Sequence, residues 1–202
     1  MKELIVILSF TEELLGTANN DPNVHSEFIL ANAPDAISRD EEIAAVGVSE
    51  VFEKSMTVFP RTCDGLPALF DYQVKGYFKD ACSMLARLKN GNESSKLKAY
   101  KNIVDGLIFV TPRLIPIMLD GEIGSCQRPF RANTPQGERV ALVTSESVPI
   151  GSTVTFSILL LDPNHEKAVR EWLDYGMLRG IGQWRNSGKG RFMWEELQSV
   201  VK

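Results

Sequence analysis

One short stretch near the end of the chain concentrates residue types that bind phosphate. Residues 180–192 read GIGQWRNSGKGRF and contain four glycines and three cations. Glycine permits positive φ and close approach of the backbone to another molecule, and successive bare N–H groups can form an anion-binding concavity. Trp184 adds an aromatic face on which a base could stack. The pattern therefore indicates contact with the phosphates and bases of a nucleic acid.

The candidate RNA-binding residues fall into this stretch and a second basic cluster. Residues 126–139 read CQRPFRANTPQGER, and Arg128 and Arg131 there could contact RNA from a β-hairpin or belong to a mobile, solvated loop. The spacing alone also fits a second interpretation, in which the glycines only make a tight helix-to-strand connection and the cations are solvated surface residues. The candidates of the glycine-rich stretch are Arg179, Gly180, Gly182, Trp184, Arg185, Gly188, Lys189, Gly190 and Arg191.

The expected neighbours of this stretch exclude other common chemistries. A Walker loop needs GxxxxGK followed by Ser or Thr between a strand and a helix, whereas this stretch follows a helix and leads to a strand. The dinucleotide-binding fingerprint fails for the same reason. Ser145 and Ser147 lack a GxSxG elbow, so a hydrolase triad has no support.

Composition predicts one ordinary globular domain over 1–202, with a possible hairpin or loop insertion around 120–139. A chain of 202 residues with 44% hydrophobic content can bury a full core. The net charge of -4 argues against a general nucleic-acid coating protein, which is usually basic throughout, but it permits a local positive patch. The three cysteines form no CxxC pair and there are only two histidines, so we expect no disulfide framework, metal or cofactor. No stretch approaches the ~20 apolar residues of a membrane span, so we expect a soluble cytoplasmic protein with no membrane partner.

Periodicity and turn residues predict the elements that position these candidates. Asp71 is expected to cap one helix, and Asn164 and Gly176 to cap and close another. The expected helices are 71–90 and 162–176, with 39–52 helical or mixed. The expected strands are 3–9, 55–61, 106–119, 139–147, 152–161 and 191–197, and 11–24 is expected as an exposed loop. This order predicts an α+β fold of ferredoxin-like kind, with an antiparallel sheet packed with helices and with Trp172 and Trp194 in the core.

These motifs resemble those of the repeat-associated (RAMP) superfamily of CRISPR RNA-binding proteins. The stretch at 180–191 matches the pattern G-x-G-x-x-(R/K)-x-x-G-x-G-(R/K) between a helix and a strand. Residues 66–81 are similar to a P-x-x-x-(L/V)-K-G motif, with Lys75 and Gly76 as the Lys-Gly pair. Residues 145–160 are similar to an E-x-V-P-x-G strand pair, with Glu146, Pro149 and Gly151 in place.

The resemblance implies a ferredoxin-like, RRM-like fold with RNA held by the glycine loop and by cations such as Lys75. Within the superfamily it is nearer to the backbone subunits that coat guide RNA than to the processing nucleases. The implied partners are single-stranded RNA of guide type and other subunits of a ribonucleoprotein, or further copies of this chain.

Catalysis is weighed separately. Some members of the superfamily cut RNA with a histidine near the first helix, and His25 lies in that region. Other members cleave target RNA with an aspartate of the first loop, and Asp21 could be that residue. The simpler interpretation is a solvated histidine and a turn-forming aspartate. We therefore expect a non-catalytic RNA-binding protein. An interaction or decoy protein without RNA, for example phage-encoded, is the alternative, and a metal-independent endoribonuclease is third.

Overall fold

The computed structural model describes residues 1–19, 56–88, 91–134 and 137–197. The segment 39–52, expected as helical or mixed, lies outside these residues, as do Asp21 and His25.

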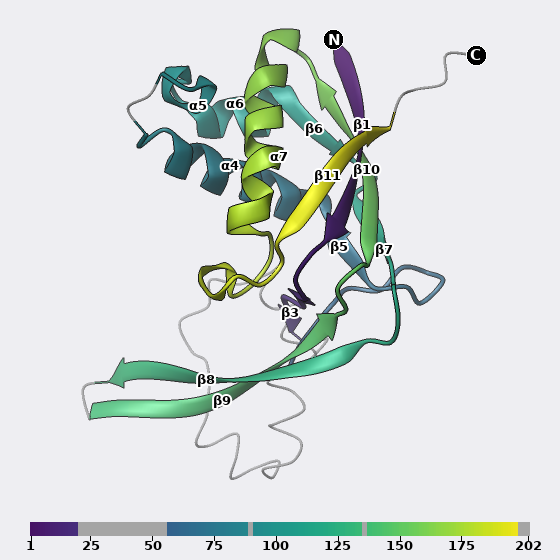
Figure 1. Cartoon of the computed structure of the whole chain (residues 1–202), viewed down its shortest axis with the longest axis vertical. Coiled ribbons are helices and arrows are strands. Elements are labelled where there is room, and N and C mark those ends of the chain that lie inside the picture. The colour runs from purple at the N-terminus through teal and green to yellow at the C-terminus, as the bar shows by residue number, and fades with distance from the viewer. Residues whose placement is uncertain (20–55, 89–90, 135–136, 198–202) are drawn as a thin grey trace, which may run out of the picture.

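A six-stranded sheet forms the centre of the molecule (Figure 1). Along β1 (Lys2–Phe10), every second side chain from Leu4 to Phe10 is buried, as the two-residue period of a strand requires. The strand pairs antiparallel with β10 (Thr153–Leu160) on one side and β11 (Phe192–Leu197) on the other. The remaining strands are β5 (Ala68–Phe70), β6 (Ile108–Thr111) and β7 (Leu114–Met118), and the last two both pair with β10.

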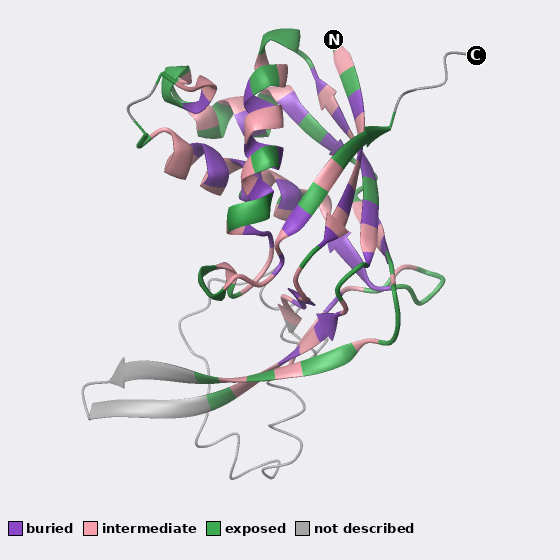
Figure 2. Cartoon of the chain, in the orientation of Figure 1, coloured by how far each residue is buried: buried purple, intermediate pink, exposed green. Residues whose placement is uncertain are grey.

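Helices pack against this sheet and bury the core between the two layers (Figure 2). Phe78, Trp172 and Phe192 are among its largest fully buried side chains. The expected α+β fold is confirmed, as is the core position of Trp172. The helices are α4 (Asp71–Leu85), α5 (Glu93–Lys96), α6 (Tyr100–Leu107) and α7 (Glu166–Arg179), with 3-10 turns at η1 (Pro163–His165) and η2 (Arg185–Ser187).

A long β-hairpin extends away from the main sheet (Figure 1). It consists of β8 (Gly124–Thr134) and β9 (Gly137–Val148), paired antiparallel along their length. Its base belongs to a second sheet with β2 (Leu14–Leu15), β3 (Ala18–Asn19) and β4 (Thr57–Val58). The hairpin base therefore lies beside the segment that follows β1.

Three expectations for the first half of the chain are wrong. The segment 11–24 is not simply an exposed loop, because Leu14 and Leu15 are fully buried and pair with β9. Asp71 does not cap α4, since the cap is Phe70, whose backbone N–H donates to Gln73 Oε1 at 2.7 Å. The α4 helix also ends at Leu85 rather than near residue 90.

The second half differs at three further points. The expected strand 106–119 is the end of α6 followed by two strands, β6 and β7. Asn164 does not cap α7: it lies in η1, where its N–H donates to Asp162 Oδ1 at 2.9 Å. Gly176 does not close α7, which continues to Arg179. Gly176 instead leaves room for the Phe192 ring, because a Cβ at this position would lie 2.2 Å from that ring.

This packing predicts opposite effects for the same substitution at two helical glycines. Gly176→Ala is expected to destabilise the fold by about 1–3 kcal/mol, because the new methyl group would overlap the Phe192 ring. Gly76→Ala, in α4, meets no atom within 4 Å and should stabilise the helix by up to about 1 kcal/mol. Urea denaturation measures both. Equal free energies of unfolding for the two variants would contradict the packing role of Gly176.

Candidate nucleic-acid interface

The glycine-rich stretch forms a loop whose two ends, at residues 180–181 and 189–190, contact each other. The N–H of Ile181 donates to the carbonyl of Gly190 at 2.9 Å. A Cβ at Gly190 would lie 1.9 Å from the Ile181 carbonyl oxygen, and one at Gly180 would lie 2.5 Å from the Lys189 carbonyl oxygen. Gly180 and Gly190 also have positive φ, of 74° and 69°. Only glycine fits at these two positions, and the reason lies within the protein itself.

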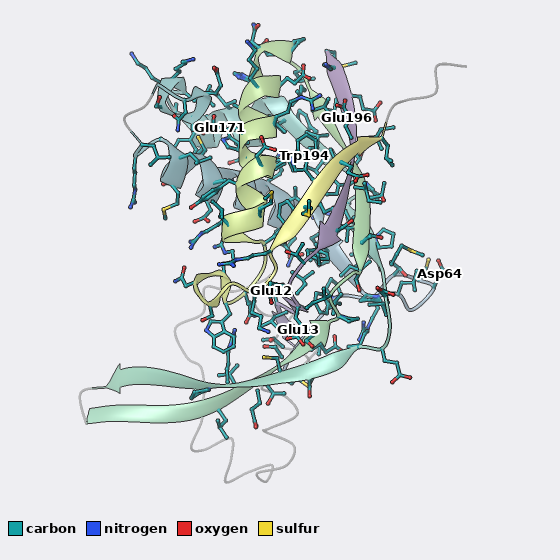
Figure 3. All side chains as sticks on the ribbon, viewed as in Figure 1. Glu12, Glu13, Asp64, Glu171, Trp194 and Glu196 are labelled. Atoms are coloured by element: carbon teal, nitrogen blue, oxygen red, sulfur yellow. The ribbon has the colours of Figure 1, made fainter. Side chains whose placement is uncertain are left out.

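The loop is also anchored to the segment after β1. Gly190 donates its N–H to the Glu13 carbonyl at 2.8 Å, and Thr11 donates its N–H to the Arg191 carbonyl at 2.9 Å. The Lys189 ammonium pairs with the Glu13 carboxylate at 2.6 Å. This hydrogen bond raises the pKa of Lys189 above its ordinary value. In Figure 3 the Glu13 label lies below the end of β1, between the loop and the base of the hairpin. The charge of Lys189 is therefore largely matched inside the protein.

One carboxylate of α4 holds two arginines, Arg179 at the end of α7 and Arg185 in the loop. Arg179 Nε and Arg185 Nη1 each donate to Asp80 Oδ2 at 2.9 Å. The hydrogen bond to Asp80 raises the pKa of Arg179, so that side chain stays charged. Arg179 also donates to Asn186 Oδ1 at 2.7 Å. Because a guanidinium carries five N–H donors and Asp80 carries one charge, the pair keeps both donors and net positive charge for a ligand.

Arg128 reaches the loop from the hairpin. Its guanidinium lies over the Trp184 ring, 5.1 Å from the centroid, and also donates to Gln183 Oε1. Its Nη1 is buried and has no hydrogen-bond partner among the described residues. Trp184 has a φ of 56°, a left-handed conformation that costs an ordinary residue about 1–2 kcal/mol. Backbone strain of this kind persists where the surroundings fix it, and it is common at binding sites.

These side chains line an open pocket of about 470 Å³ between the loop and the hairpin base, here named the arginine groove. A second pocket of about 250 Å³ adjoins it against α4 and shares Gly182 and Arg185 with it. Three guanidiniums and an exposed indole face in one groove can hold phosphates and stack a base. The arginine groove is lined by Arg128, Pro129, Arg179, Gly182, Gln183, Trp184, Arg185 and Asn186.

The structure brings together five of the residues that the sequence singled out and separates others from them. Lys189 and Lys75 do not line the arginine groove. Lys75 lies over the Phe109 ring and donates to the Asp105 carbonyl at 3.1 Å. Arg131 is opposite Val140 in the hairpin, and only its backbone is described. The five residues brought together are Arg128, Arg179, Gly182, Trp184 and Arg185.

Gly188 and Arg191 form a separate contact in the loop. A Cβ at Gly188 would lie 3.3 Å from the Arg191 guanidinium carbon, so a glycine leaves room for that side chain. Arg191 Nε is buried and has no hydrogen-bond partner among the described residues.

Sequence reasoning missed Asp80, Gln183 and Asn186, which the site uses. Asp80 had a usable signal, because it lies three and seven residues after Tyr77 and Gln73 on one helical face. The two amides had none, since their role depends on which atoms the folded loop brings near.

Other candidate centres can be placed among the described residues. His165 lies in η1, with Nε2 3.8 Å from Asp162 Oδ2. No group of three or more His, Cys, Asp or Glu side chains in the described part of the chain could hold a metal. Trp194, expected in the core, is only partly buried and donates to Asp174 Oδ1 at 2.8 Å. Within 1–19, 56–88, 91–134 and 137–197, no helix is long and apolar enough to cross a membrane.

Comparison with known proteins identifies the fold. No family model and no curated protein matches the chain. Among solved structures, it is similar to a chain of the type III-B Cmr-β complex bound to cognate target RNA, at 12% identity and a TM-score of 0.54. That match covers 98% of this chain and 60% of the other, so this chain spans about three fifths of its length. A chain of a type IV-B CRISPR complex matches at 9% identity and a TM-score of 0.49, over 100% of this chain and 92% of that one. The likeness to the Cmr-β chain shows a shared fold, in agreement with the α+β fold expected from the sequence.

The crossing of the loop predicts that Gly190 tolerates alanine worse than another glycine with similar φ. Gly65 has a φ of 80° and open space around it, so Gly65→Ala should cost only the left-handed penalty of about 1–2 kcal/mol. Gly190→Ala adds a clash with the Ile181 carbonyl and should cost at least about 1 kcal/mol more. Urea denaturation of both variants gives the difference. Equal losses would mean that the crossing is not a tight constraint.

Proposed function

We propose that this protein is a non-catalytic RNA-binding subunit of a CRISPR-type ribonucleoprotein, or a protein that acts on one. It binds single-stranded RNA in the arginine groove, with phosphates on the guanidiniums and a base on Trp184. The whole chain, 1–202, is taken as one RAMP-like domain. The observation that carries the proposal is that three arginines and an exposed tryptophan, from segments far apart in the sequence, line one open groove.

The charge and donors of the groove favour phosphate. Its lining residues include three arginines and no acidic side chain. Asp80 is the carboxylate that pairs with Arg179 and Arg185, and it leaves one positive charge on that pair. Arg128 adds a second charge and a buried donor with no partner among the described residues. Phosphodiester oxygens match such a set of forked donors.

The position of Trp184 favours a single strand over a duplex. Trp184 is 37% exposed and Arg128 lies over its ring, so a base could stack beside a guanidinium plane. Bases of a single strand can be splayed out to reach such a surface, whereas bases in a helix are already stacked. The fold shared with a chain of an RNA-bound complex is consistent with this ligand.

A second candidate is an interaction protein that keeps the fold without RNA. The observation in its favour is that Asp80 and Glu13 already pair with Arg179, Arg185 and Lys189. These cations could serve only to fix the loop. A purified protein that remains folded and binds no single-stranded RNA at low salt would support this candidate.

The first test compares two arginines that each lie over a tryptophan. Arg128→Gln is expected to weaken RNA binding and to flatten the plot of log affinity against log salt by about 0.7 per lost phosphate contact. Arg170, 5.6 Å from the Trp194 ring, lies outside the groove, so Arg170→Gln should leave the slope unchanged. Fluorescence anisotropy with labelled oligouridylate at several salt concentrations measures both slopes. Equal slopes for Arg128→Gln and the unmodified protein would remove Arg128 from the site.

The second test separates stacking from charge. Trp184→Leu is expected to lower RNA affinity by about 5- to 150-fold, the value of one stacked base, without changing the salt slope. Trp194→Leu removes the other tryptophan that carries an arginine over its ring, and it should not change RNA affinity. If both variants bind RNA as the unmodified protein does, no base stacks on Trp184.

A further inference from the structure

The helix α4 separates two surfaces of the molecule. Gln73, Gly76 and Tyr77 line the pocket next to the arginine groove, and Asp80 pairs with the loop arginines. Lys75 and Lys79, one turn apart, instead contact α6 and β6. The second surface, here named the α4–α6 face, consists of Lys75, Lys79, Lys101, Asp105 and Phe109.

The α4–α6 face has more positive than negative charge. Lys79 pairs with Asp105 Oδ1 at 2.6 Å, and Lys75 donates to the Asp105 backbone carbonyl at 3.1 Å. The exposed Lys101 lies one helical turn before Asp105 in α6. The face therefore carries three lysines and one carboxylate, which pairs with Lys79 and belongs to a side chain that is 58% exposed.

The face also presents an aromatic ring. Phe109 lies on β6 and is 40% exposed, unlike its neighbours Ile108 and Val110, which are buried. The Lys75 ammonium is 5.1 Å from the centroid of the Phe109 ring. An exposed ring beside several cations is the combination that holds single-stranded nucleic acid through stacking and backbone contact.

The sequence that contains α4, α5 and the start of α6 has an excess of basic residues, of which Lys75, Lys79 and Lys101 belong to the α4–α6 face. The chain has a net charge of -4, but residues 75–101 contain seven basic residues against two acidic ones. Such an excess on an acidic protein indicates a polyanionic partner. The acidic residues are Asp80 and Glu93, and the basic ones are Lys75, Lys79, Arg87, Lys89, Lys96, Lys98 and Lys101.

We propose that the α4–α6 face is a second nucleic-acid site, which binds the phosphodiester backbone of a single strand. The strand is either a continuation of the RNA in the arginine groove or a separate molecule. The exposed Phe109 ring favours a nucleic acid over an acidic protein, because a base offers a flat surface for stacking. The site does not depend on the arginine groove, since the two surfaces use different residues of α4.

The experiment uses the full chain with the double variant Lys75→Gln/Lys101→Gln and oligouridylates of two lengths. One is about 8 nucleotides long, within the range of a single binding module, and the other is several times longer. Affinity is measured against salt concentration, and stoichiometry is measured with the short strand. Lys167→Gln, an exposed lysine of α7, is the control for Lys101→Gln.

If one strand continues from the arginine groove, the double variant should flatten the slope of log affinity against log salt for the long RNA by up to about 1.4, which corresponds to two phosphate contacts. It leaves the slope of the short RNA unchanged. A separate strand predicts that the number of short strands bound falls from two to one. Unchanged slope and stoichiometry would overturn the second site. Competition by polyglutamate as strong as competition by RNA would also overturn it, because the α4–α6 face would then bind an acidic protein. Arg128→Gln, measured in parallel, reports on the arginine groove alone, so failure of one site is distinguishable from failure of the other.

Discussion

The crossing of the glycine loop is the constraint on which the rest of the candidate site depends. Where α7 ends, the chain must leave the helix, make a loop and return to start β11, and its two ends meet at the hydrogen bond from Ile181 to Gly190. No side chain fits at that contact, because a Cβ at Gly190 would overlap the Ile181 carbonyl. With the ends fixed, the loop between them is held at a set orientation. Trp184 and Arg185 then lie opposite the hairpin and α4.

The outer glycines of the loop and Lys189 make contacts within the protein itself. Gly180 and Gly190 allow the protein to contact itself, and Gly182 lies 3.0 Å, measured from its ideal Cβ position, from a Leu14 methyl carbon. Lys189 anchors the loop to Glu13. The side chains of the arginine groove come from the middle of the loop, from the end of α7 and from the hairpin, which supplies Arg128, while Asp80 of α4 pairs with two of the arginines. A loop fixed by its ends can present its middle without reordering when a ligand binds, which lowers the entropic cost of binding.

The helix α4 lies between two basic surfaces, which explains why two candidate RNA contacts of the sequence are separated in the structure. Lys75 and the glycine loop both suggested RNA contact, yet they do not meet in the structure. Side chains at positions 75 and 79 leave the helix on a different side from those at 73, 77 and 80, as the helical period requires. Lys75 therefore lies on the α4–α6 face with Phe109, and it does not line the arginine groove.

Several helices and strands could be predicted because their patterns involve only residues that are close together in the chain. The period-2 burial of β1, the 3.6-residue period of α4 and α7, and the glycine pattern of the loop all depend on neighbouring residues, and the α+β fold followed from their order. Local patterns did not show that Gly176 lies inside α7 or that Leu14 is buried. Gly176 packs against Phe192 and Leu14 pairs with β9, and both partners are distant in sequence. Nor could the sequence by itself pair Arg128 with Trp184 or two arginines with Asp80. Such pairs depend on which surfaces pack together, and only tertiary structure decides that.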